Sequence, residues 1–148
     1  MEPIRCVIAG CGGYTSHVLP SAAKHADFEI VGLVDPDPAR IESARRLIPR
    51  ADVPGFAAIE EALRRVRPDL VFVHTPVGAH FAVCRTALEA GCHVSVAKPF
   101  VDRLAEARAL IALAQTARRF VSVQQTARLG RGRCIKEWLT DGTVGPPR

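Results

Sequence analysis

Short apolar segments alternate with segments of helix length along the whole chain, and this alternation restricts the fold more than any other feature. Five segments are short, apolar on both faces and bounded by turn residues, and we expect strands at Cys6–Ala9, Ile30–Val34, Leu70–Val73, His93–Ala97 and Val121–Val123. The segments between them predict helices at Ser16–Lys24, Pro38–Ile48, Ile59–Val66, His80–Ala90 and Leu104–Ala117. Strands of this kind belong in a parallel sheet, so we expect an α/β fold with a doubly wound sheet and helices on both faces.

The length of 148 residues and the hydrophobic content of 48% fit one domain with one core. We expect a single domain over residues 1–148, in which about 125–148 form the transition towards a further domain that the chain lacks. No apolar run reaches the roughly 18 residues that a membrane span needs, and the first residues do not form a signal peptide pattern. We therefore expect a cytoplasmic protein that does not contact membranes.

A glycine-rich turn follows the first expected strand and leads into a helix. The turn contains Gly10, Gly12 and Gly13, followed by Tyr14 and Thr15. This context is typical of a Rossmann dinucleotide site, where the first glycine allows a tight turn and the second allows the pyrophosphate to approach the backbone. Thr15 stands where the motif has a third glycine or alanine; it loosens the packing of strand on helix, or its hydroxyl contacts a phosphate.

Asp35 ends the second expected strand, about twenty residues beyond the glycines, where a carboxylate accepts the ribose hydroxyls of NAD. The same carboxylate would repel a 2′-phosphate, which favours NAD over NADP. The alternative is that Asp35 only caps the helix that starts at Pro38. The glycine turn and Asp35 together predict binding of a dinucleotide.

Two further turns end at the same edge of the expected sheet. Thr75, Pro76 and His80 follow the third expected strand and can line the cofactor groove, although His80 is equally well explained as a helix N-terminal residue bonded to backbone. We interpret His74 as a core histidine. Lys98 precedes Pro99 at the end of the next strand, where an ammonium group can act on a hydroxyl or carbonyl near the nicotinamide, and burial would tune its pKa. The alternative is a lysine that extends from the strand end into water.

Cysteine and charge patterns exclude other classes of site. The five cysteines are Cys6, Cys11, Cys84, Cys92 and Cys134, which form no C-x-x-C pair, so we interpret them as small core residues and expect no metal. The net charge is +5, and basic residues gather near the C-terminus at Arg118, Arg119, Arg128, Arg131, Arg133 and Lys136. Because no aromatic platform interleaves them and no helix-turn-helix or zinc pattern appears, we interpret these residues as a solvated face or the surface for a missing partner, and we expect no nucleic acid partner.

The last expected helix has a candidate N-cap at Asp102. Leu104, Ala107, Ile111 and Ala114 fall on one side of it, so we expect these four side chains to face the core.

These motifs together resemble the glucose-fructose oxidoreductase and inositol 2-dehydrogenase family, Gfo/Idh/MocA, over essentially the whole chain. The resemblance rests on residues 7–13 with 34–37, on residues 75–80, and on residues 87–94 leading to Lys98-Pro99. It implies reversible hydride transfer between a nicotinamide and a carbon that bears a hydroxyl, on a sugar, inositol or related polyol. It also implies that Lys98 lies beside the nicotinamide and assists proton transfer.

Two departures from the family pattern limit what the resemblance implies. Ala97 stands where the family has a glutamate, and the chain stops where a C-terminal substrate domain would begin. We expect NAD binding without appreciable turnover unless a second domain completes the site for a sugar or polyol substrate, and association of identical copies is possible. The alternative is a non-catalytic module that senses a dinucleotide or serves as a scaffold.

Overall fold

The computed structural model describes residues 2–50, 52–125, 136–138 and 140–142. The strands are β1 (Ile4–Ala9), β2 (Phe28–Val34), β3 (Gly55–Phe56), β4 (Leu70–Val73), β5 (His93–Ala97) and β6 (Val121–Gln124). The helices around the sheet are α1 (Gly13–Ala22), α2 (Pro38–Arg45), α3 (Ile59–Val66), α4 (Val77–Glu89) and α5 (Leu104–Ala117).

All strand pairs are parallel, and the strand order is β3-β2-β1-β4-β5-β6. The chain therefore moves outward in one direction from β1 and, after crossing over, in the opposite direction from β4. Ligands of open α/β sheets bind at such a switch point, outside the carboxyl ends of the two central strands. The turns after β1 and β4 are thus placed side by side.

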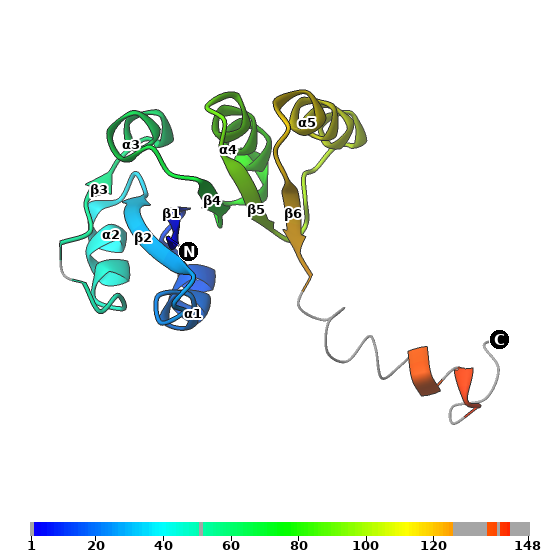
Figure 1. Cartoon of the computed structure of the whole chain (residues 1–148), viewed down its shortest axis with the longest axis horizontal. Coiled ribbons are helices and arrows are strands. Elements are labelled where there is room, and N and C mark those ends of the chain that lie inside the picture. The colour runs from blue at the N-terminus through cyan, green and yellow to red at the C-terminus, as the bar shows by residue number, and fades with distance from the viewer. Residues whose placement is uncertain (1, 51, 126–135, 139, 143–148) are drawn as a thin grey trace.

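Helices cover both faces of the sheet, as expected (Figure 1). On one face α3, α4 and α5 pack on alternate strand residues, including Val7, Val71 and Val94, which are all buried. On the other face α1 and α2 pack through Leu19 and Ile41 over the half of the sheet formed by β1, β2 and β3. In the described part of the chain, no helix lies on this second face over β4, β5 and β6.

The expected elements form, but several begin or end elsewhere. The α4 helix starts at Val77 rather than at His80 because Pro76 takes the N-cap position, and α1 starts at Gly13 rather than at Ser16. The strand β3 was not expected. It has only two residues, too few to show a period-2 pattern, and it is defined by its pairing with β2.

The expectation for the core face of α5 is wrong in part. The side chains of Leu104 and Ile111 are 67% and 49% exposed, whereas Leu110 is buried and packs in the core with Ala114. Leu104, Leu110 and Ile111 are all apolar, so the sequence did not indicate which side of the helix is buried. Packing against the core selected the side that carries Leu110. The N-cap is also Arg103 rather than Asp102, without a side-chain capping bond.

Four of the five cysteines are buried with free thiols, in agreement with their interpretation as small core residues; they are Cys6, Cys11, Cys84 and Cys92. Cys134 and the arginines at 128, 131 and 133 lie outside the described residues. None of the described helices is long and apolar enough to cross a membrane.

Candidate functional site

The glycine turn after β1 is fitted tightly against the end of β4. Gly10 has a φ of +94°, and a Cβ at this position would lie 2.6 Å from the carbonyl carbon of His74 and 2.7 Å from the amide nitrogen of Thr75. Only glycine fits this conformation and this approach without strain. At Gly12 and Gly13, in contrast, a Cβ would meet no described atom within 4 Å. The turn therefore leaves an open space beside the N-terminus of α1, where free N–H groups favour an anion.

Asp35 lines this space, and its hydrogen bonds also hold the surrounding loops in place. Its Oδ2 accepts a hydrogen bond from the Cys11 amide at 2.9 Å, and its Oδ1 accepts one from the Asp37 amide at 3.0 Å. The residue is only 5% exposed. The N-cap of α2 is Asp37, whose Oδ1 accepts the Ala39 amide, so the alternative interpretation of Asp35 as that cap is wrong. The carboxylate has lone pairs left for a ligand in the crevice.

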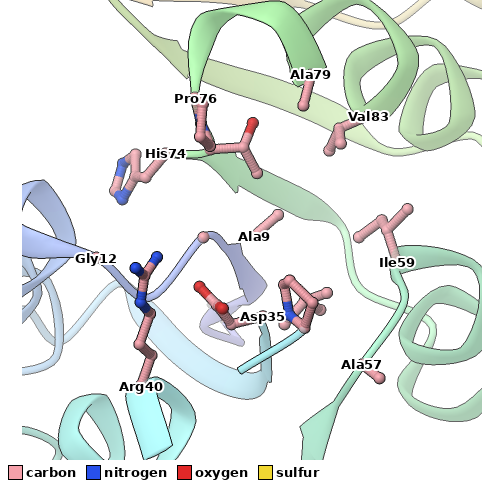
Figure 2. Close-up of a pocket in the computed structure, with 14 residues that line it drawn as sticks. Ala9, Gly12, Asp35, Arg40, Ala57, Ile59, His74, Pro76, Ala79 and Val83 are labelled. Atoms are coloured by element: carbon pink, nitrogen blue, oxygen red, sulfur yellow. The ribbon is translucent and has the colours of Figure 1, made fainter. Parts of the chain in front are cut away.

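Two cavities follow the carboxyl ends of the strands and share His74 and Thr75. The larger has a volume of about 520 Å³, and the expected site residues that line it are Gly10, Gly12, Asp35, Thr75 and Pro76. Figure 2 shows the Asp35 side chain directed into it, with Arg40 extending from α2 beside Gly12. The smaller has a volume of about 320 Å³, and the expected residues that line it are Tyr14, Thr75, His80, Lys98 and Pro99.

The structure contains an unpaired polar group at the junction of the two cavities. The Thr75 Oγ1 is buried and has no hydrogen-bond partner among the described residues. Buried hydroxyls without a partner are rare, because each costs about 1–3 kcal/mol. Together with the open space at Gly12 and the Asp35 carboxylate, this hydroxyl fits a dinucleotide that lies across the crevice.

Thr15 does not face this space. Its side chain is fully buried, and its hydroxyl lies 2.5 Å from the Gly10 carbonyl oxygen and 2.9 Å from Nδ1 of His74. The expectation that this hydroxyl contacts a phosphate is therefore not supported. Gly13 likewise lines neither cavity.

His80 connects two loops of the site through backbone oxygens. Its Nε2 lies 2.9 Å from the Thr75 carbonyl oxygen, and its Nδ1 lies 3.0 Å from the Pro99 and 3.1 Å from the Phe100 carbonyl oxygens. Both ring nitrogens lie against backbone carbonyl oxygens, and the nitrogen that carries the proton donates to its carbonyl. This arrangement favours the interpretation of His80 as a residue bonded to backbone, which holds the loop after β4 against the loop after β5.

Lys98 is exposed at the mouth of the smaller cavity, so the expectation of a buried lysine is wrong. No carboxylate of the described residues forms an ion pair with it. Ala97, which precedes it, lines the same cavity and supplies no charge. The ammonium group is free to meet a ligand.

Sequence reasoning missed two side chains at the site. His74 lines both cavities instead of lying in the core, and Arg40 lines the larger one. The position of His74, immediately after β4 and before Thr75, was a signal for the same strand-end rule that we applied to Thr75 and Pro76.

A family model described as an oxidoreductase family with an NAD-binding Rossmann fold matches residues 4–125. Among curated proteins, the chain is 34% identical over 120 residues to an uncharacterized oxidoreductase, YdgJ, of Escherichia coli, which is 78% of this chain and 35% of that protein. It is 27% identical to glycosyl hydrolase family 109 protein 4 of Phocaeicola vulgatus, over 97% of this chain and 28% of that protein.

Solved structures share the fold. The WlbA dehydrogenase of Chromobacterium violaceum, solved with NADH and UDP-GlcNAcA, superposes with a TM-score of 0.85 and 26% identity, over 95% of this chain and 41% of that chain. An oxidoreductase of Klebsiella pneumoniae superposes with a TM-score of 0.80 and 32% identity, over 98% of this chain and 41% of that chain. The chain thus spans less than half the length of each of these four proteins.

Proposed function

Because the chain belongs to the Gfo/Idh/MocA oxidoreductase family with its NAD-binding Rossmann fold, we propose that it is the cofactor half of an enzyme that transfers hydride between NAD and a hydroxyl-bearing carbon of a sugar or polyol. The observation that carries the proposal is a pair of adjoining cavities that share His74 and Thr75, the first lined by Asp35 and the second by Lys98. A dinucleotide is long enough to need both cavities.

Each part of the crevice suits one part of the cofactor. The Asp35 carboxylate accepts hydrogen bonds from the adenosine ribose hydroxyls. The backbone at Gly12 leaves room for the pyrophosphate at the N-terminus of α1. The Thr75 hydroxyl, unpaired within the described protein, lies where the two halves of the cofactor meet. Tyr14 and Lys98 then line the nicotinamide end.

Asp35 also supports a preference for NAD over NADP. Both its oxygens are held by backbone amides, so the carboxylate cannot rotate away from a 2′-phosphate placed beside it. A phosphate there would meet a fixed negative charge in a buried setting, where repulsion is stronger than in water.

Among the described residues that line the smaller cavity, Lys98 is our candidate for proton transfer. As an ammonium group it can donate a hydrogen bond to the substrate oxygen, and as a neutral amine it can accept the hydroxyl proton while hydride leaves the adjacent carbon. The bound nicotinamide supplies the hydride chemistry. The relatives are more than twice as long as the matched region, and we propose that a second domain, on this chain's natural continuation or on a partner, orients the sugar or polyol and excludes water.

The test compares NAD and NADP binding by calorimetry in the wild type and in Asp35→Ala. We expect the wild type to bind NAD more tightly than NADP. In Asp35→Ala, NAD loses the two hydrogen bonds from its ribose hydroxyls to the carboxylate, so we expect NAD affinity to fall roughly 10–100-fold. The 2′-phosphate of NADP no longer meets a negative charge, so the ratio of NAD to NADP affinity should fall towards one.

A matched control is Asp69→Ala. Asp69 also accepts a backbone amide, from Arg5 at 2.9 Å, but it precedes β4 at the opposite edge of the sheet. This variant should keep the NAD to NADP ratio of the wild type. Absence of NAD binding by the wild type, or an unchanged ratio in Asp35→Ala, would refute the proposal.

A second candidate is a regulatory module that binds the dinucleotide without turnover. It is favoured by Ala97, which leaves Lys98 without a neighbouring carboxylate in the described part of the chain. The two functions are separated by assaying a form that carries the second domain: oxidation of any polyol supports the enzyme, and tight binding without any turnover supports the module.

A further inference from the structure

A chain of hydrogen bonds passes through His74 and connects three elements around the crevice. On one side of the ring, Nδ1 lies 2.9 Å from Oγ1 of Thr15, whose hydroxyl donates to the Gly10 carbonyl. On the other side, Nε2 lies 3.1 Å from Nε2 of Gln124 in β6. The Tyr14 hydroxyl donates to Oε1 of Gln124 at 2.8 Å.

The proton positions in this chain follow from its ends. The Gly10 carbonyl can only accept, so the Thr15 hydroxyl proton points to it, and the hydroxyl oxygen must accept from His74. His74 is then the Nδ1–H tautomer, and its bare Nε2 accepts from the Gln124 amide group. The Gln124 carbonyl oxygen is left to accept from Tyr14, so every group in the chain is satisfied in one arrangement.

The two arms of His74 serve different parts of the crevice. The inner arm, Thr15 and Gly10, fixes the glycine turn beside the larger cavity. The outer arm, Gln124 and Tyr14, fixes a wall of the smaller cavity, because the Tyr14 ring lines that cavity and meets the His74 ring edge to face with centroids 4.9 Å apart. Gln124 is further held by Ser95, whose Oγ accepts from its amide at 3.1 Å.

We propose that His74 is a positioning residue of the nicotinamide subsite, which holds the Tyr14 wall through Gln124 in a register set by the glycine turn. The inference rests on the proposed binding of NAD across both cavities. It assigns to His74, Gln124 and Tyr14 a shared role in seating the nicotinamide ring, separate from binding of the adenosine half.

The surroundings of His74 keep its ring in the neutral form that this hydrogen-bond chain needs. Burial lowers the pKa of His74 to about 4, so the ring is neutral near pH 7 and Nε2 remains an acceptor. The other ionisable groups of the described residues that line the smaller cavity are His80 from α4, Lys98 after β5 and Tyr14 from α1, and none of them is a carboxylate that would favour an imidazolium.

The test measures dissociation constants for NADH and for ADP-ribose, which lacks the nicotinamide ring. In His74→Asn, the side-chain amide can still donate to Thr15 but does not reach Gln124. We expect NADH affinity to fall about tenfold and ADP-ribose affinity to stay within about twofold of the wild type. In His74→Gln, which reaches Gln124 but not Thr15, both ligands should weaken together.

Tyr14→Phe gives an independent test that removes one hydroxyl from a side chain at the surface, and it should reproduce the selective loss of NADH affinity. Ser122→Ala is the matched control, because Ser122 lies on the same face of β6 outside the hydrogen-bond chain; it should bind both ligands as the wild type does. The tautomer is read directly from ¹⁵N spectra of the histidine rings, where we expect a proton on Nδ1 of His74.

Equal loss of both ligands in His74→Asn, unchanged NADH binding in Tyr14→Phe, or an Nε2–H tautomer would overturn the inference. A wild type that binds ADP-ribose and NADH equally well would do so too. Failure of the wild type to bind either ligand is a different result, which refutes the proposed function itself, and the ¹⁵N measurement then still decides whether the hydrogen-bond chain exists.

Discussion

Replacing Gly10 by alanine tests the claim that this glycine serves the fold while Gly12 serves the ligand. The new Cβ of Gly10→Ala would lie 2.6–2.7 Å from three backbone atoms of His74 and Thr75, which have no rotamer to relieve the contact. The φ of +94° adds about 1–2 kcal/mol of strain for an L-residue.

The expected loss in stability of Gly10→Ala can be estimated from the backbone movement that the new Cβ requires. Relief of the contact requires the ends of β1 and β4 to separate, and this breaks the hydrogen bond of 2.7 Å from the His74 amide to the Ala9 carbonyl, worth about 1 kcal/mol. With the strain at Gly10, the total loss in free energy of unfolding is about 2–3 kcal/mol. For a domain of this size, that corresponds to a fall in Tm of roughly 4–12 °C.

Gly12→Ala is the matched variant. Gly12 has a φ of −81°, which alanine adopts freely, and no described atom lies within 4 Å of the added Cβ. Its free energy of unfolding should stay within about 0.5 kcal/mol of the wild type, while NADH affinity falls because the methyl group occupies the approach of the pyrophosphate. Urea denaturation and NADH fluorescence titration measure the two effects. If Gly10→Ala is as stable as Gly12→Ala, the assignment of roles to these glycines is wrong.

Three further predictions concern packing and protonation. Because the folded pKa of His74 is about 4 and its unfolded value about 6.5, the unfolded state takes up the proton first, so up to about 3 kcal/mol of stability is lost as pH falls from 6.5 to 4. This pH dependence, followed by thermal denaturation, should be absent from His74→Asn. Thr15→Val should cost about 1–3 kcal/mol in urea denaturation, since the Gly10 carbonyl loses its donor and His74 its acceptor, whereas Thr15→Ser should restore most of it; equal stability of the two variants would count against the bonds. Leu110→Ala should cost about 2–5 kcal/mol and Ile111→Ala well under half of that, and the reverse order would show that α5 faces the other way.

The local pattern of the sequence was enough to predict most of this fold. Strands β4 and β5 and helices α3 and α5 have the bounds that periodicity predicted, because each is set by residues within a few positions of one another. The same holds for the turn at Gly10 and for the position of Asp35 at the end of β2. The expectation that these two would meet also came from a local motif, since β1 and β2 are joined by a single helix.

What the sequence alone could not provide depends on segments that are distant along the chain. His74 meets Thr15 and Gln124, which are 59 and 50 positions away, only because the strand order places β4 beside β1 and the end of β6 one strand beyond β5. The buried face of α5 was undecided for a similar reason, since apolar residues lie all round that helix and packing selected Leu110. Hydrophobic periodicity reports on residues within a few positions of one another along the chain. The partners of a hydrogen bond or of a buried side chain can be distant in sequence, and tertiary packing determines them. The sequence by itself therefore determined that Gly10 and Asp35 belong to one ligand crevice, and the tertiary structure decided that His74 lines both of its cavities.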